Sequence, residues 1–99
     1  MNKLSLTIEN SAEKDMYTIA DYNAKDNKKA ALQLVKEFYT SFNLFCLHPQ
    51  IGFERKDFTH KNVRFYVVKK NYLIVYTIFE NSVHILRVLS AYQDICSMF

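Results

Sequence analysis

Hydrophobic and polar residues alternate at the start of the chain. Residues 4–8 place leucine, leucine and isoleucine at every second position, which is the pattern of a strand with one buried face. From residue 10 onward, apolar residues recur at helical spacing, which predicts a short helix that ends near residues 22–23. Asn10 or Ser11 is the expected N-cap, and Glu13 follows Asn10 by three residues, as in a capping box.

A second, longer helix is predicted after residues 26–27, where Asp and Asn supply the next N-cap. Its apolar residues form one stripe, and a helix with such a stripe normally buries it against a sheet or another helix. The helix is expected to end at His48-Pro49, because the residue before proline is disfavoured in the α region. The stripe consists of Ala31, Leu34, Val35, Phe38, Phe42, Phe45 and Cys46.

Three segments rich in Val, Ile, Tyr and Phe dominate the second half of the chain. Residues 63–69, 72–79 and 82–89 have the composition of β-strands and are separated by short polar turns. They predict a three-stranded antiparallel meander. The fold class is therefore α+β, with a strand, two helices packed as a hairpin and then the meander, in one domain over residues 1–99.

The two turns of the meander set which residues face each other. A two-residue turn at 80–81 pairs Tyr76 with Ile85 and Ile74 with Arg87. The earlier turn leaves two registers open, because it can contain residues 70–71 or residues 69–71. The two registers differ by one residue, which changes the neighbours of every side chain in the first strand.

The three-residue turn sorts the side chains better and is the preferred register. It gathers aliphatic residues on one face, which is expected to pack on the helices, where each large apolar side chain contributes roughly 1.5–3 kcal/mol. The other face is expected to be a shallow surface with two guanidinium groups and two phenols, suited to carboxylates or phosphates. The aliphatic face holds Val63, Phe65, Val67, Leu73, Val75, Leu86 and Val88, and the open face holds Arg64, Tyr66, Tyr76 and Arg87.

Positive charge is concentrated in the second half of the chain. The net charge is +3, and residues 48–99 carry seven Lys and Arg against four acidic residues, whereas six lysines balance six acidic residues in 1–47. A positive surface around Arg55 and Arg64 would suit an acidic protein partner or phosphates. Lysines that serve only solubility explain the lysine part of this excess equally well.

The composition argues against several other classes of protein. No apolar run approaches the ~20 residues needed to cross a bilayer, and residues 1–10 lack the apolar core of a signal peptide. We therefore expect a cytoplasmic protein that does not associate with a membrane. Two cysteines and three histidines without close spacing, and no glycine-rich loop, predict neither a metal site nor a cofactor.

The order and spacing of several residues in the second half resemble ParE toxins of the RelE/ParE superfamily. The resemblance implies the RelE-like α+β fold and a cognate antitoxin, whose acidic, partly disordered segment folds over the toxin. Contact with DNA is then expected only indirectly, through the antitoxin. The matching features are Pro49-x-x-Gly52-x-x-Arg55, then Arg64, the strand Tyr72-Leu-Ile-Val-Tyr76, the strand Ile85-Leu-Arg-Val-Leu89 and the following Gln93-Asp94.

The superfamily divides by target, so two hypotheses for function follow from the resemblance. RelE-like members cut messenger RNA on the ribosome, whereas ParE-like members inhibit DNA gyrase. RNA cleavage by a 2′-hydroxyl needs a base, an acid and cations that stabilise the phosphorane. Arg64, Arg87 and Tyr92 are the candidates for a ribonuclease, but none of the three histidines is well placed as their base.

The favoured expectation is therefore a toxin that inhibits gyrase by binding rather than by catalysis, with a ribosome-dependent endoribonuclease as the alternative. For Arg64 and Arg87, pairing with surface carboxylates or stacking on Tyr76 is an equally weighted structural role. The residues expected to contact a partner are Arg55, Arg64, Tyr66, Tyr76, Arg87 and Tyr92.

Overall fold

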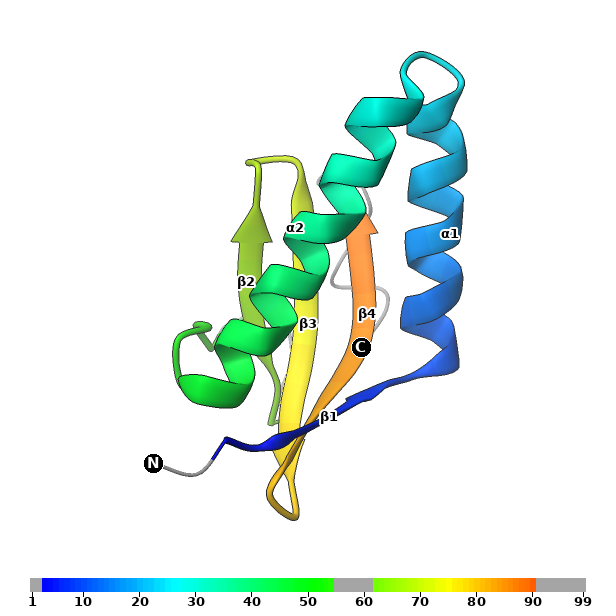
Figure 1. The fold of residues 1–99 in the computed structure, drawn as a ribbon. Coiled ribbons are helices and arrows are strands. Elements are labelled where there is room, and N and C mark those ends of the chain that lie inside the picture. The colour runs from blue at the N-terminus through cyan, green and yellow to red at the C-terminus, as the bar shows by residue number, and fades with distance from the viewer. Residues whose placement is uncertain (1–2, 55–61, 91–99) are drawn as a thin grey trace.

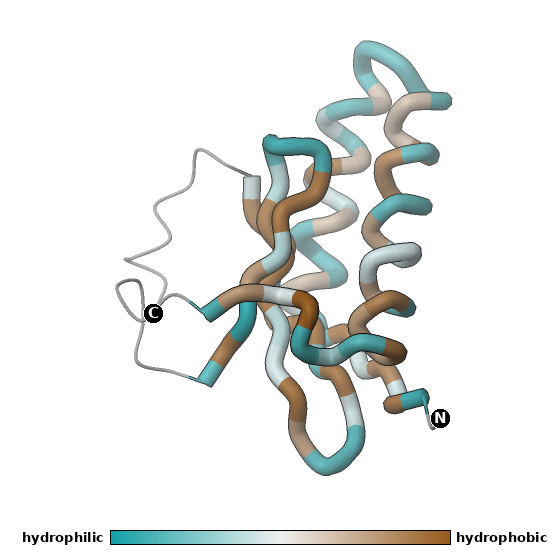
Figure 2. Tube along the Cα trace, turned by 90° about the vertical axis from the view of Figure 1, so that its left-hand side faces the viewer, coloured by the Kyte–Doolittle hydropathy of each residue, from teal (hydrophilic) through white to brown (hydrophobic). Residues whose placement is uncertain are grey.

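The structure is a computed structural model that describes residues 3–54 and 62–90. Two helices form a hairpin on one face of a four-stranded sheet (Figures 1 and 2). This α+β arrangement confirms the fold class predicted from the sequence. The elements are β1 (Ser5–Ile8), α1 (Asn10–Ala24), α2 (Lys28–Leu47), β2 (Arg64–Val68), β3 (Tyr72–Phe79) and β4 (Ser82–Ser90).

The strands lie in the order β1-β4-β3-β2, so β1 and β2 are the edges of the sheet. Strands β2, β3 and β4 form the expected antiparallel meander, whereas β1 pairs in parallel with β4. That parallel pairing covers only the first half of β4, from Ser82 to Ile85. Within residues 3–54 and 62–90, no strand pairs with the second half of β4 on that side, and α1 lies along it (Figure 1).

Helix α2 begins and ends as its sequence predicts. The side-chain oxygen of Asn27 accepts a hydrogen bond from the backbone N–H of Ala30 at 3.1 Å, which satisfies one of the free N–H groups of the first turn. At the other end, the N–H of His48 bonds to the carbonyl oxygen of Leu44 just before Pro49. The predicted stripe is buried except for Val35, which is half-buried.

The predicted N-cap of the first helix is wrong. Glu9 occupies the N-cap position and makes no side-chain cap, whereas Asn10 and Ser11 lie inside the helix. The hydroxyl of Ser11 donates instead to the carbonyl oxygen of Leu86 at 2.8 Å. A contact across the fold has therefore replaced the local one, and it attaches α1 to the free side of β4.

Both turns of the meander have the predicted lengths. Val68 faces Tyr72, which leaves a three-residue turn at 69–71 and confirms the preferred register. The two-residue turn of Glu80 and Asn81 has positive φ at both positions, 50° and 61°. This backbone twist matches that of the flanking antiparallel strands.

One pairing prediction holds and the other is wrong, because β4 contains a β-bulge. Tyr76 faces Ile85 as predicted, but Ile74 faces Val88 and Arg87 faces Val75. The register changes between Val75 and Tyr76, so β4 has one more residue than β3 over this stretch. The bulge shifts the later part of β4 by one position relative to the sequence-based alignment.

The two faces of the sheet are assigned the opposite way to the prediction. The face that carries Tyr66 and Tyr76 lies under the helices, and Tyr76 stacks on Phe45 of α2 with ring centroids 4.1 Å apart and planes 11° apart. Aromatic rings on both α2 and the sheet fill this interface more fully than the shorter aliphatic side chains would. The opposite face carries a second apolar cluster, composed of Val63, Phe65, Leu73, Val75 and Leu89, with Leu86 beside it.

Candidate functional site

The side chain of Tyr76 holds the short loop that follows α2. Its ring is fully buried, and its hydroxyl donates to the carbonyl oxygen of Pro49 and accepts from the N–H of Gly52, both at 2.8 Å. Burial raises the pKa of the Tyr76 phenol, while the hydrogen bond from Gly52 and the charge of Arg64 oppose that rise. The phenol therefore stays neutral at physiological pH and keeps its donor proton.

Gly52 is needed because the chain passes so close to Tyr76. A Cβ atom at this position would lie 2.6 Å from the Tyr76 hydroxyl and 2.9 Å from the carbonyl oxygen of Phe65. The next residue, Phe53, exchanges two backbone hydrogen bonds with Phe65 of β2. Residues 49–53, which we call the locked loop, are thus fixed to the sheet at several points.

Arg64 completes this arrangement from the edge strand β2. Its Nη1 donates to the carbonyl oxygen of Gly52 at 2.7 Å and lies 3.4 Å from that of Gln50. A charged donor of this kind makes a stronger hydrogen bond than a neutral one. Pro49, Gly52, Arg64 and Tyr76, which the sequence showed only as spaced positions, therefore form one structural unit.

Arg87, on strand β4, forms an ion pair with Asp15 of helix α1. Its Nε lies 2.7 Å from Asp15 Oδ2 and its Nη2 lies 2.9 Å from Oδ1, which makes a two-pronged ion pair. Asp15 Oδ2 also accepts from the backbone N–H of Val88, at 3.0 Å, on the side of β4 that faces α1. The hydrogen bonds that Arg87 donates to the carboxylate of Asp15 raise the pKa of Arg87.

Sequence reasoning missed Asp15. Its position in a predicted helix gives no sign that it meets residue 87, because the two are 72 residues apart in the chain. A helical projection would have placed it on the same face as Ala12, three residues earlier, which is buried, and so near the sheet. Only the bulge in β4 and the docking of α1 bring the two charges together.

The structure does not bring the predicted site residues together on one open surface. Arg64 turns toward the locked loop and Arg87 toward α1, with β3 between their strands. Two strand spacings correspond to roughly 10 Å. Tyr66 is half-buried against Phe45, so the expected surface of two arginines and two tyrosines is wrong. Arg55 and Tyr92 lie outside the described residues.

His84, the histidine nearest to Arg87 in sequence, contacts neighbouring side chains rather than a reactive group. The His84 Nδ1 lies 3.6 Å from Glu9 Oε1, and its ring contacts Phe79, as in a structural role. Within residues 3–54 and 62–90, no three Cys, His, Asp or Glu side chains gather as metal ligands would. No helix in these ranges is long and apolar enough to span a bilayer.

Comparison with known proteins assigns the chain to a family. The model of the family described as "ParE toxin of type II toxin-antitoxin system, parDE" matches residues 6–95, which is most of the sequence. The chain belongs to this family. No curated protein matches the sequence.

Two solved structures share the fold of this ParE-family chain. One, titled a chromosomal ParDE toxin-antitoxin system from P. aeruginosa, has a TM-score of 0.74 and 18% identity, over 89% of this chain and 96% of that one. The other, a toxin-antitoxin complex RelBE2 from Mycobacterium tuberculosis, has a TM-score of 0.60 and 16% identity, over 94% and 97%. At these identities the likeness is one of fold.

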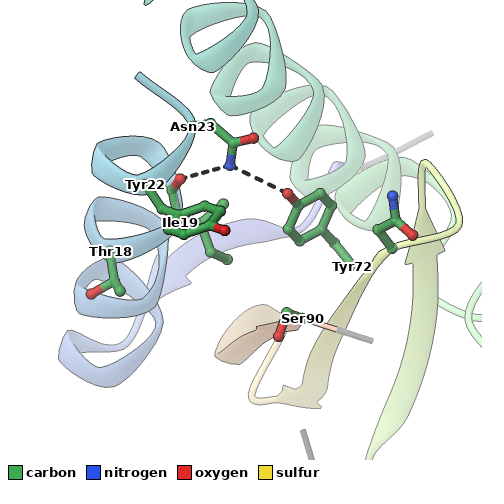
Figure 3. Close-up of a pocket in the computed structure, with 7 residues that line it drawn as sticks. Thr18, Ile19, Tyr22, Asn23, Tyr72 and Ser90 are labelled. Atoms are coloured by element: carbon green, nitrogen blue, oxygen red, sulfur yellow. Dashed lines mark hydrogen bonds between the residues drawn. The ribbon is translucent and has the colours of Figure 1, made fainter. Parts of the chain in front are cut away.

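The ParE-family chain also has a cleft that its sequence did not predict. It lies between the C-terminal half of α1 and the ends of β3 and β4, and its volume is about 450 Å³ (Figure 3). Asn23 Nδ2 bonds to the hydroxyl of Tyr72 at 3.3 Å and to the carbonyl oxygen of Ile19 at 2.8 Å. The lining residues are Thr18, Ile19, Tyr22, Asn23, Asn71, Tyr72 and Ser90.

Proposed function

We propose that this ParE-family protein is the toxin of a toxin–antitoxin pair, that it arrests growth by binding and inhibiting DNA gyrase, and that a cognate antitoxin neutralises it. Family membership supports the toxin role. The choice of inhibition by binding over RNA cleavage rests on one observation. Both arginines that could stabilise a cleavage transition state are engaged within the protein.

The engagement of these arginines matters because of what RNA cleavage requires. Cations must face the phosphorane as its charge develops, and they must be in position beforehand. Arg87 directs two of its nitrogens at the carboxylate of Asp15, and Arg64 directs Nη1 at the carbonyl oxygen of Gly52. Either group would have to give up a short charged hydrogen bond before it could bind phosphate. A role in maintaining the shape of a binding protein needs no such rearrangement.

Two features support an antitoxin partner. The two solved structures described above are titled as toxin-antitoxin assemblies. The chain also carries exposed apolar side chains on helix α2 of its hairpin, among them Leu32 and Tyr39. Its net charge of +3 is of the sign that suits an acidic antitoxin segment.

A supercoiling assay tests the proposal directly. Purified protein is titrated into gyrase, ATP and relaxed plasmid, and we expect supercoiling to fall as the folded protein exceeds gyrase. The antitoxin encoded beside the gene should restore supercoiling when it is added in equimolar amount. The control is the same toxin–antitoxin complex formed beforehand, which should not inhibit. Unchanged supercoiling at a large excess of folded protein would contradict the proposal.

The alternative, a ribosome-dependent endoribonuclease that uses Arg64, Arg87 and Tyr92, predicts a different result. Ribosomes carrying a defined messenger would show cleavage in the A site, and Tyr92→Phe would abolish it. Under our proposal the messenger stays intact, and Tyr92→Phe remains as inhibitory toward gyrase as the parent. Induction in cells should then give filamentation with DNA damage rather than arrest of translation.

A further inference from the structure

The cleft between α1 and the ends of β3 and β4 has the features of a binding site for one aromatic side chain. We propose that it receives such a side chain from an acidic segment of a partner protein. The inference rests on the proposed function insofar as that partner is the antitoxin. The site itself is argued only from its walls, its chemistry and the charges around it.

The walls of the cleft include two tyrosine rings held in different ways. Tyr72 packs edge-on against Phe38, with centroids 5.6 Å apart, and its hydroxyl accepts a hydrogen bond from Asn23. Its position is therefore fixed before any ligand arrives. Tyr22 comes from α1 and is 71% exposed. Figure 3 shows Tyr22 and Tyr72 on opposite sides of the cleft, with Ser90 at its lower end.

The lining contains hydroxyl, amide and aliphatic groups but no charged side chain among the described residues. The volume of about 450 Å³ lies within the range of roughly 300–1,000 Å³ that is usual for ligand pockets. A free amino acid or nucleotide would bring its charges into the cleft, where the described lining residues offer no charged partner and Lys25 and Lys70 are not among them. An aromatic side chain on a polypeptide brings only an uncharged group, and the hydroxyls and amides of the lining are available for its polar edge.

The exposed ring of Tyr22 suggests how such a side chain would be bound. An aromatic ring that enters the cleft would remove much of Tyr22 from water and pack against Tyr72. Tyrosines in such pockets contribute strongly to binding because they bury a large area and lose little conformational entropy. Ring pairs of this kind also add roughly 0.5–1.5 kcal/mol beyond area burial.

The charges around the cleft favour an acidic partner segment. Lys25 follows the lining residue Asn23 by two positions, and Lys70 directly precedes Asn71. Both lysines are exposed, and neither forms an ion pair with another residue in the described ranges. At the α1–α2 tip and the β2–β3 turn, the lysines that make no ion pair with a described residue outnumber the acidic residues. These residues are Asp21, Lys25, Asp26, Lys28, Lys29 and Lys70.

An NMR titration of the full chain tests the inference. The probe is a blocked peptide with one phenylalanine between aspartate and glutamate residues. We expect saturable shifts of the amides of Tyr22, Asn23 and Tyr72, and binding about tenfold weaker when the peptide phenylalanine is replaced by alanine, which corresponds to ~1.4 kcal/mol. Added salt should weaken binding through the flanking lysines.

Three variants locate the site. Tyr22→Ala removes one wall, and Thr18→Trp fills the cleft from an exposed helix position. Each variant should bind the phenylalanine peptide about tenfold or more weakly than the parent does. Tyr17→Ala is the matched control, because Tyr17 is 65% exposed on the same helix but does not line the cleft. It should bind like the parent, and equal binding by all four proteins would overturn the assignment.

Other results of the titration would show that the cleft does not bind a peptide side chain. Absence of cleft shifts at millimolar peptide, or shifts only at the locked loop, would refute the proposal. Cleft shifts with AMP but not with the peptide would also refute it and would indicate a nucleotide ligand. The result is separate from the gyrase assay, since a peptide that binds while supercoiling continues would overturn only the proposed target.

Discussion

Tyr76 connects three parts of the molecule through one side chain. Its ring stacks on Phe45 of α2, it lies at the centre of β3, and its hydroxyl binds the locked loop on both sides of Ile51. The loop therefore depends on a buried hydroxyl whose two hydrogen bonds have no solvent to replace them. Gly52 provides the space that this contact requires.

Removal of the Tyr76 hydroxyl tests this dependence. Tyr76→Phe leaves the N–H of Gly52 and the carbonyl oxygen of Pro49 without this partner, and we expect the free energy of unfolding to fall by about 1–3 kcal/mol. Urea denaturation measures the loss, and amide hydrogen exchange should be faster at Gly52. Tyr17→Phe, at an exposed tyrosine, should stay within about 0.5 kcal/mol of the parent.

Tyr76→Phe and Gly52→Ala can be combined in a double-mutant cycle. The added methyl group would meet the Tyr76 hydroxyl at 2.6 Å, so it should destabilise the parent more than it destabilises Tyr76→Phe. The rescue should be partial, because the Tyr76 ring and the Phe65 carbonyl oxygen remain within 2.8 and 2.9 Å. Equal costs in the two backgrounds would show that contact with the hydroxyl does not explain the glycine.

The raised pKa of Tyr76 predicts a loss of stability at alkaline pH. Below its ordinary pKa of 10.0 the phenol is neutral in both states, so its contribution is fully present. Above that pH the unfolded chain loses the proton first, and stability falls as pH rises through the folded pKa. Urea midpoints of the parent should therefore fall more steeply above pH 10 than those of Tyr76→Phe. Cys46 is kept in both proteins, because burial raises its pKa as well.

At the scale of elements, α1 takes the place of a strand along the second half of β4. Ser11 donates to the carbonyl oxygen of Leu86, and Asp15 accepts from the N–H of Val88. Exposed strand edges tend to recruit other strands, and these two contacts cover part of that edge. The ion pair with Arg87 holds the carboxylate in place.

Asp15→Asn should weaken the attachment of α1 to β4. The neutral amide loses the two-pronged ion pair, although one oxygen can still accept from Val88. Asp15 is 16% exposed and Arg87 31%, so the expected cost of about 1–3 kcal/mol lies between those of exposed and buried pairs. Thermal and urea unfolding measure it. Asp21→Asn, at an exposed position on the same helix, serves as the control and should cost less than about 0.5 kcal/mol.

The two helix N-termini give a matched pair of predictions. Asn27 caps α2 with its side chain, so Asn27→Ala should cost about 1 kcal/mol. Asn10 lies inside α1, which begins without a side-chain cap, so Asn10→Ala should change stability by less than about 0.5 kcal/mol. Comparable losses in the two variants would show that Asn10 caps α1 in solution.

At the scale of the whole molecule, the two arginines in the described residues lie apart rather than together in a phosphate site. Arg64 supports the locked loop at one edge of the sheet, and Arg87 fixes α1 at the opposite side of β4. Strand β3 lies between their strands, so neither moves toward the other without disruption of its own contacts. This arrangement is the physical basis for preferring inhibition by binding.

Arg87→Gln separates the two functional hypotheses. The variant should unfold at lower temperature than the parent because Asp15 loses its ion-pair partner. If Arg87 has only this structural role, gyrase inhibition per folded molecule should equal that of the parent at a temperature where circular dichroism shows both folded. A cation of a ribonuclease site would instead lower the rate of cleavage about 10²–10³-fold in the folded protein.

The sequence by itself determined the local features of this protein. Periodicity predicted α2 and its buried stripe, and Asn27 and Pro49 predicted its two ends. The preferred three-residue turn followed from the alternation of side chains in β2 and β3, and the structure confirms it. The spacing from Pro49 to Asp94 indicated the ParE family, which the family match over residues 6–95 confirms. Each feature depends on residues close together in the chain or on their order.

The tertiary structure decided which face of the sheet meets the helices. Both faces carry apolar residues, so alternation separates them without showing which one is covered by α1 and α2. The β-bulge moved Arg87 by one position relative to β3, and the docking of α1 then supplied Asp15. Partners distant in sequence leave no local pattern, which is why the roles of Arg64, Tyr76 and Arg87 became apparent only in the folded chain.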